Sequence, residues 1–230
     1  MRATGGGFSN GQGERLARGL LSSSMPNLSP SKIVCVGRNY AAHAKELGND
    51  VPREPLIFLK PPSSIIRDGD SIRLPPVSKH VEYEGEIAVV IGQRLRQATA
   101  DEARAAVAGI VAANDVTARD LQKSDGQWTR AKGFDTFCAL GPVGQVPTDL
   151  SSLVVTTRVN GSVRQEGRAR DMVFDIPAIL SFISGIMTLE PGDLVLTGTP
   201  EGVGTLAPGD VVEVEIAGVS RVSNPVTSDE

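Results

Sequence analysis

Three carboxylates in the sequence have the spacing of ligands for a divalent cation. Glu84 and Glu86 open an apolar run that predicts a strand to Ile91, and alternate residues of a strand point to one face. Two carboxylates that close repel each other unless a cation neutralises them. Asp115 follows a second apolar run, 109–113, at a predicted strand end. Carboxylate oxygens suit Mg²⁺, Mn²⁺ or Ca²⁺ rather than zinc or copper. The alternative is a solvated polar strand face.

A histidine and a glutamate form a second candidate group. His43 and Glu46 are three residues apart in a short helix predicted over 39–47, with Asn39 as its N-cap. Residues at this spacing share a helix face, so Glu46 could orient the imidazole for removing a proton from water. The alternative is an exposed pair without function. His80 stands beside a lysine without a comparable partner and is predicted to be structural.

Basic residues and a glycine-rich turn suggest an anionic substrate. The basic candidates are Arg38, Lys60, Arg119 and Lys132. The turn 198–204 follows a predicted strand and can present backbone N–H groups to an anion. It lacks the G-K-[ST] sequence of a P-loop, and the chain has no G-x-S-x-G nucleophile elbow and no G-x-G-x-x-G dinucleotide loop. Serine hydrolase and Rossmann oxidoreductase assignments therefore lose their usual support.

The elements that must position these residues are mostly short strands. The predicted strands are 33–36, 56–59, 84–91, 109–113, 154–159, 162–165, 195–197 and 211–216, and the predicted helices are 39–47, 99–107 and 176–186. Asn160–Gly161 is a strong hairpin signal. Thr99 and Glu102 have capping-box spacing. Many short strands with few helices favour a β-sandwich or roll over a parallel α/β sheet, so the predicted class is mostly β with a few short helices.

Composition limits the class of protein. The chain has 230 residues, 40% of them hydrophobic, and a net charge of −4 without any Lys/Arg run, which argues against nucleic-acid binding. The sequence contains no apolar stretch of about 18 residues or more, so no membrane-spanning helix is predicted. Cys35 and Cys138 are interpreted as buried free thiols of a reducing compartment rather than a disulfide.

The beginning of the chain differs from the remainder. Residues 1–30 are rich in Gly and Ser and are predicted to be a flexible leader before a single catalytic domain, 31–230. The leader has no apolar core of signal-peptide length, so we expect a cytoplasmic protein. Its Arg and Ser content leaves organellar targeting open. A tail that precedes an internal start near Met25 is the preferred interpretation.

The order of these motifs resembles the fumarylacetoacetate hydrolase superfamily, especially its short single-domain branch of acylpyruvases and 2-hydroxyhepta-2,4-diene-1,7-dioate isomerases. The resemblance covers roughly residues 32 to 220. The segments that carry it are 34–41 with His43 and Glu46, then 58–61, 83–92, 114–122, 131–135, 159–161 and 196–204. The resemblance implies a mixed β-sandwich or roll, commonly assembled as a homodimer.

The resemblance also implies roles for individual residues. Glu84, Glu86 and Asp115 match the family's metal-binding carboxylates, with Mg²⁺ or Mn²⁺ expected and Ca²⁺ possible. His43 and Glu46 match the pair that activates water. Lys132 and Gln122 match positions that face the substrate and its oxyanion, and Thr199 matches a residue that holds the substrate carboxylate. Arg38, Lys60 and Arg119 lie in family motifs and are predicted to bind substrate.

The expected function is a metal-dependent hydrolase that cleaves a C–C bond in acylpyruvate-type 2,4-dioxo acids, for example acylpyruvate or fumarylpyruvate. The partner is then a small 2-oxo acid. The same metal site would serve oxaloacetate decarboxylation or isomerisation of 2-hydroxyhepta-2,4-diene-1,7-dioate, because all three reactions stabilise an enolate. A non-enzymatic Ca²⁺-binding β-domain is the alternative from another class.

Overall fold

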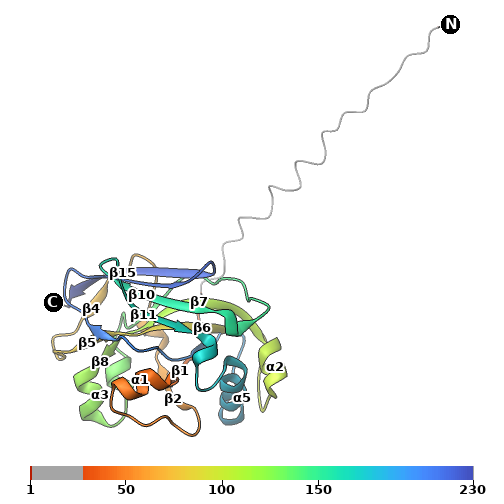
Figure 1. The fold of residues 1–230 in the computed structure, drawn as a ribbon, viewed down its shortest axis with the longest axis horizontal. Coiled ribbons are helices and arrows are strands. Elements are labelled where there is room, and N and C mark those ends of the chain that lie inside the picture. The colour runs from red at the N-terminus through yellow and green to blue at the C-terminus, as the bar shows by residue number, and fades with distance from the viewer. Residues whose placement is uncertain (2–27, 230) are drawn as a thin grey trace.

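The computed structural model describes Met1 and residues 28–229. The predicted leader, 1–30, therefore lies almost wholly outside the described residues. The described chain is mostly β, with stacked sheets and the helices gathered along one side of them (Figure 1). The predicted fold class, mostly β with a few short helices, is confirmed.

The largest sheet has seven strands in the order β2-β1-β12-β6-β7-β9-β3. Their bounds are β1 Ile33–Gly37, β2 Leu56–Lys60, β3 Ile65–Ile66, β6 Gly85–Ile91, β7 Val107–Asp115, β9 Cys138–Leu140 and β12 Leu194–Leu196. Strand β6 is buried at every position, including the carboxylate-bearing Glu86. It runs antiparallel to β7 with Gly85 opposite Asn114, so the start of β6 lies beside the end of β7.

A second sheet has five strands in the order β11-β10-β14-β15-β4, and a small third sheet has the order β13-β5-β8. The bounds are β4 Ile72–Leu74, β5 Val81–Tyr83, β8 Thr117–Ala118, β10 Val154–Val159, β11 Ser162–Arg168, β13 Gly204–Thr205, β14 Val211–Ile216 and β15 Ser220–Ser228. The predicted hairpin joins β10 to β11. Asn160 and Gly161 have φ of 52° and 78°, as a tight hairpin turn of this type requires.

The structure describes five α-helices: α1 Ala41–Glu46, α2 Ala100–Ala105, α3 Arg119–Asp125, α4 Thr129–Lys132 and α5 Ile176–Ile186. Short 3₁₀ turns occupy Pro62–Ser64, Leu150–Ser152 and Ala169–Asp171. The predicted capping box of Thr99 and Glu102 begins α2. The prediction that Asn39 caps α1 is wrong, because Tyr40 is the N-cap. The Asn39 amide instead donates to the carbonyls of Phe174 and Thr197, at 3.0 and 2.8 Å.

Alternating residues of the seven-stranded sheet build two apolar layers. Val34, Ile87 and Val89 belong to the main core, which also contains residues of the five-stranded sheet and of α5. Residues of the opposite face, Cys35 and Cys138 among them, form a separate buried cluster. Both cysteines are free thiols, as predicted, and burial raises their pKa. No helix in the described part of the chain is long and apolar enough to cross a membrane.

Candidate active site

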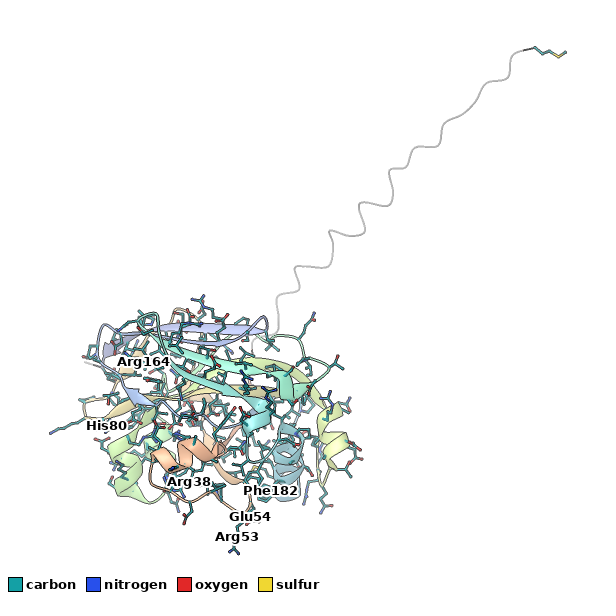
Figure 2. The ribbon with its side chains drawn as sticks, in the orientation of Figure 1. Arg38, Arg53, Glu54, His80, Arg164 and Phe182 are labelled. Carbon is teal, nitrogen blue, oxygen red and sulfur yellow. The ribbon has the colours of Figure 1, made fainter. Side chains whose placement is uncertain are left out.

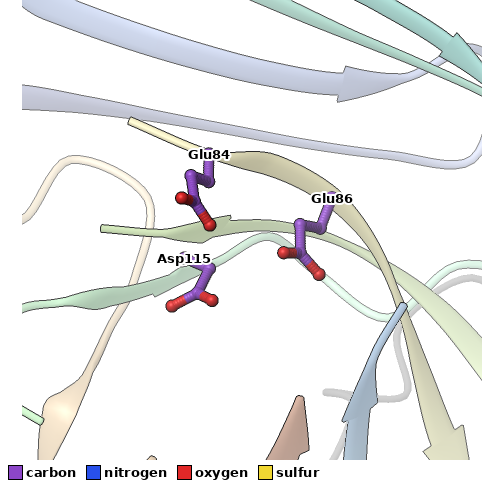
Figure 3. Close-up of side chains that lie close together, drawn as sticks. All are labelled: Glu84, Glu86 and Asp115. Atoms are coloured by element: carbon purple, nitrogen blue, oxygen red, sulfur yellow. The ribbon is translucent and has the colours of Figure 1, made fainter. Parts of the chain in front are cut away.

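Three carboxylates meet where β6 begins and β7 ends. Glu84 directly precedes β6, Glu86 is its second residue, and Asp115 is the last residue of β7. A ligand oxygen from each lies within 4.8 Å of the others, and all three side chains are buried. In Figure 3, Glu84 and Glu86 reach from one strand toward Asp115 on its neighbour. The strand pairing therefore produces the convergence that the sequence predicted.

A glycine between the two glutamates permits close packing behind them. A Cβ at Gly85 would lie 1.8 Å from Oγ1 of Thr157 on β10, so only glycine fits here. The buried Gln165 on β11 accepts the Gly85 N–H at 3.0 Å and donates to Thr199 Oγ1 and Pro200 O, each at 2.8 Å. Gln165 thus ties three segments together beneath the carboxylates. Sequence reasoning missed it, because no local pattern marks it.

Buried cations neutralise two of the three carboxylates. Lys132 Nζ lies 2.7 Å from both Glu84 Oε2 and Asp115 Oδ2, and Lys60 Nζ lies 2.6 Å from Asp115 Oδ1. Arg119 Nη2 lies 2.5 Å from Glu84 Oε1. Burial raises the pKa of Glu84, but Lys132 and Arg119 outweigh burial and hold that pKa well below its usual range. Glu84 is therefore ionised.

Glu86 forms no ion pair within residues 28–229, although the charge of Lys132 partly offsets the rise of its pKa. One of its oxygens accepts the Gly198 N–H at 2.7 Å, and no lysine or arginine pairs with it. Burial raises the pKa of Glu86 well above its usual value, and the charges of Asp115 and Glu84 raise it further. A divalent cation among three hard oxygen donors would offset this cost. The donor set therefore fits Mg²⁺ or Mn²⁺.

A chain of ion pairs extends from the carboxylates toward the surface. Arg119 also contacts Glu82 Oε2 through Nε at 2.7 Å and donates to Gln122 Oε1 at 2.5 Å. The other oxygen of Glu82 lies 2.8 Å from Nε2 of His80, a partly exposed residue labelled in Figure 2. His80 thus has the carboxylate partner that the sequence analysis did not find. Glu82 extends the alternation to residues 82, 84 and 86, a pattern that could have identified it.

His43 and Glu46 of α1 form the predicted pair. His43 is buried, and its Nδ1 lies 3.1 Å from Glu46 Oε2. Glu46 Oε1 accepts the Gly202 N–H at 3.0 Å, which docks α1 onto the glycine-rich turn. That turn does present N–H groups to anions, as predicted, but in this structure the anions are the protein's own Glu46 and Glu86.

One cavity of about 430 Å³ connects the two groups. Ten of the predicted site residues line it: Arg38, His43, Glu46, Glu84, Glu86, Asp115, Arg119, Gln122, Lys132 and Thr199. Phe58 and Trp128 supply an apolar wall, with ring centroids 5.2 Å apart. Lys132 Nζ lies 5.0 Å from the Phe58 ring centroid. The three carboxylates, the His43–Glu46 pair and Lys132 therefore line one cavity.

Two residues that were predicted to bind substrate form contacts with the protein itself. Lys60 does not line the cavity, so we expect it to position Asp115 rather than contact the substrate. Thr199 lines the cavity, but its hydroxyl donates to Gly85 O at 2.9 Å and accepts from Gln165. Any contact of Thr199 with a substrate carboxylate would compete with these bonds.

Comparison with known proteins agrees with this geometry. Residues 32–227 match the family profile described as fumarylacetoacetate (FAA) hydrolase, C-terminal. The chain is 48% identical over 198 residues to the mitochondrial oxaloacetate tautomerase of Arabidopsis thaliana, covering 84% of this chain and 89% of that one. It is 44% identical over 197 residues to the mitochondrial oxaloacetate decarboxylase of Dictyostelium discoideum, covering 82% and 89%.

A solved structure extends the comparison. The crystal structure of 2-hydroxyhepta-2,4-diene-1,7-dioate isomerase from Mycobacterium marinum superposes with a TM-score of 0.81 at 46% identity. The aligned region covers 88% of this chain and 76% of the isomerase chain.

Proposed function

Because the chain belongs to the fumarylacetoacetate hydrolase family, we propose that it is a metal-dependent enzyme that interconverts the keto and enol forms of oxaloacetate or a close 2-oxo acid. The observation that carries this proposal is the single cavity lined by both the carboxylate triad and the His43–Glu46 pair. The relatives named for oxaloacetate chemistry, 48% and 44% identical, support the choice of substrate. Their names favour oxaloacetate over the acylpyruvate hydrolysis expected from sequence.

The triad would hold the cation through Glu84, Glu86 and Asp115, with Mg²⁺ or Mn²⁺ expected. When bound, such a cation supplies Lewis acidity that withdraws charge from the 2-oxo group of the substrate. The remaining chemistry is proton transfer, for which the chain has its own residues.

His43 is suited to act as the base. With the Nδ1 proton donated to Glu46, the Nε2 lone pair is free to accept a proton. His43 removes a proton from C3 of the 2-oxo acid and leaves an enolate, and return of this proton from His43 through solvent to the enolate oxygen gives the enol. In the reverse direction the enol O–H proton passes to solvent, and protonated His43 transfers its proton to C3. Glu46 fixes the orientation of the ring throughout.

Lys132 is suited to stabilise the negative charge that develops on the 2-oxo oxygen. Burial lowers its pKa, but Asp115 and Glu84 outweigh burial and raise the pKa above its usual value, so the ammonium stays charged. Two of its three N–H groups are used by Glu84 and Asp115. The third remains for an oxygen in the cavity.

Decarboxylation of oxaloacetate is the second candidate, favoured by the name of the Dictyostelium relative. It forms the same type of enolate by loss of CO₂ and requires no base. Hydrolysis of an acylpyruvate would additionally require His43 to activate a water molecule.

Three parallel assays with Mg²⁺ test the proposal. Coupling to malate dehydrogenase follows the keto form of oxaloacetate, lactate dehydrogenase detects pyruvate, and loss of the enol absorbance follows acetylpyruvate. We expect faster keto–enol exchange than in a metal-only control. Pyruvate formation without faster exchange would identify a decarboxylase, and acetylpyruvate turnover alone would restore the hydrolase assignment.

We also propose that the enzyme is a cytoplasmic homodimer, with organellar targeting as the alternative location. Strand β2 lies at the edge of the seven-stranded sheet and exposes one leucine on each face, Leu56 and Leu59, so a second copy that covers this edge would bury both. Light scattering should then give about twice the chain mass of 24.2 kDa.

A further inference from the structure

Two basic side chains line the cavity and have no part in the mechanism above. Arg38 is half-buried and Lys123 is exposed, so they lie toward the solvent side of the cavity. The other basic side chains that line the cavity, Arg119 and Lys132, form ion pairs with the carboxylate of Glu84. Within residues 28–229, the side chains of Arg38 and Lys123 form no ion pair and no hydrogen bond. The cavity therefore offers two uncommitted positive charges.

The backbone at Arg38 is held in an unusual conformation. Its φ is 58°, in the left-handed region that residues with a Cβ disfavour. The chain is fixed on both sides: a Cβ on Gly37 would lie 2.8 Å from Trp128, and Asn39 bonds to Thr197 and Phe174. A strained residue in a cavity lining is a candidate for function, because a glycine would relieve the strain.

Lys123 extends a row of polar residues along α3. Arg119, Gln122 and Lys123 have spacings of three and four residues, which place them on one helix face. Arg119 contacts Glu84, and Lys123 lies one turn farther along the helix. The row thus runs from the buried carboxylates to the solvent side of the cavity.

We propose that Arg38 and Lys123 bind the second carboxylate of the substrate and make the enzyme selective for dicarboxylic 2-oxo acids. The inference rests on the proposed function, because that function orients the 2-oxo acid end toward the buried triad. The other end of the substrate then lies near Arg38 and Lys123. A carboxylate there would find two cations that no group of the described chain already uses.

A matched pair of unreactive ligands isolates this interaction. Oxamate and N-oxalylglycine share the same 2-oxo acid head, and N-oxalylglycine adds one CH₂ and one carboxylate. Binding to the Mg²⁺-loaded protein can be followed by fluorescence of Trp128, the single tryptophan of the chain, which lines the cavity, and by calorimetry. We expect N-oxalylglycine to bind at least about tenfold more tightly, as charged hydrogen bonds allow.

The variants Arg38→Met and Lys123→Met should reduce this preference, by about tenfold for half-buried Arg38 and about threefold for exposed Lys123. The affinity for oxamate should stay unchanged. Arg38→Gly should lose the same preference without loss of stability, because glycine accepts the positive φ. Lys45→Met is the matched control: Lys45 is exposed on α1 but does not line the cavity.

Equal affinities for the two ligands, a preference that survives in the double variant Arg38→Met/Lys123→Met, or no binding of either ligand would overturn the inference. Failure of the proposed function looks different. In that case the preference and its loss in the variants would be observed, but oxaloacetate would not be turned over. Turnover of oxaloacetate with an unchanged preference would reject this inference alone.

Discussion

At the scale of single residues, the burial of Glu86 without an ion-pair partner explains why a cation would stabilise the site. Lys132, Lys60 and Arg119 pair with Glu84 and Asp115, whereas Glu86 receives one backbone N–H. Buried carboxylates without a cationic partner are costly. In the metal-free fold this cost raises the pKa of Glu86 well above its usual value, and a bound cation would stabilise the ionised carboxylate.

Replacing Glu86 by glutamine separates metal binding from folding. We expect Glu86→Gln to weaken Mn²⁺ binding by about tenfold or more, measured by calorimetry, because one charged ligand is lost. In EDTA the same variant should melt about 2–4 °C higher for each kcal/mol that ionising the buried Glu86 carboxyl costs the fold at the pH of the measurement. Glu166→Gln, on the exposed face of β11, is the control and should change neither quantity. Unaltered Mn²⁺ affinity in Glu86→Gln would remove Glu86 from the ligand set.

The role of His43 as a base makes a second prediction at this scale. His43→Ala should slow metal-dependent keto–enol exchange of oxaloacetate by about 10²-fold or more, the usual contribution of a positioned base. Decarboxylation requires no base and should change much less. Oxamate affinity in the presence of Mg²⁺ serves as the control for an intact site. A His43→Ala protein with full exchange activity would contradict the assignment.

At the scale of elements, turn chemistry determines where glycine is required. Gly161 has φ of +78° in the β10–β11 turn, and Gly185 lies in α5 without a positive φ; neither would place a Cβ within 4 Å of another atom. Gly161→Ala should therefore destabilise the fold by about 1–2 kcal/mol through backbone strain alone. Gly185→Ala should stabilise it by about 0.5–1 kcal/mol. Urea unfolding measures the change in the free energy of unfolding for each variant. If both substitutions stabilised the fold, or both destabilised it, the explanation would be refuted.

A buried aspartate attaches the start of the described chain to the turn before β12. Asp193 accepts hydrogen bonds from Ser31 N, Ser31 Oγ, Lys32 N and Glu190 N at 2.7–3.1 Å and pairs with Lys32 Nζ. Burial raises the pKa of Asp193, but the bonds from Lys32 and Glu190 outweigh burial and lower that pKa below its usual value. The ionised form is therefore the one that stabilises the fold.

This lowered pKa predicts a pH-dependent effect of Asp193→Asn. The stabilising contribution is complete above the unfolded pKa of about 3.9 and disappears as the pH falls through the folded pKa. Asp193→Asn should thus cost about 1–3 kcal/mol at pH 7. The difference from wild type should shrink as the pH falls below about 4. Urea unfolding at pH 7 and at successive pH values below 4 measures it, and a constant difference would contradict the prediction.

The sequence predicts the elements with strong periodicity and misses those without it. Helix α5 and strands β10 and β14 agree with their predicted bounds. Strand β15 was not predicted, and it contains Pro225, a residue that is unfavourable in the middle of a sheet. In the structure Pro225 faces Val211, the first residue of β14, at the end of that ladder, where a missing N–H matters little. Helices α3 and α4 are short and polar, which leaves no apolar period to detect.

At the scale of the whole molecule, the site depends on contacts between distant segments. Strand β1 lies parallel to β12, and Gln165 of β11 bonds to both Gly85 and Thr199. Local patterns contain no information on such pairing. The triad and the His43–Glu46 pair were predictable from spacing and from the family resemblance. Gln165 and Lys123 were not, because only the folded chain brings them to the site.

The measurement that tests the account most directly is the ketonisation rate of enol-oxaloacetate with the full-length protein and Mg²⁺, before and after excess EDTA. The account predicts a rate well above a Mg²⁺-only control, its loss in EDTA and its recovery when Mn²⁺ is added. A rate that EDTA leaves unchanged, or one no faster than Mg²⁺ alone, would contradict the claim that the buried carboxylate site and His43 act together on a 2-oxo acid.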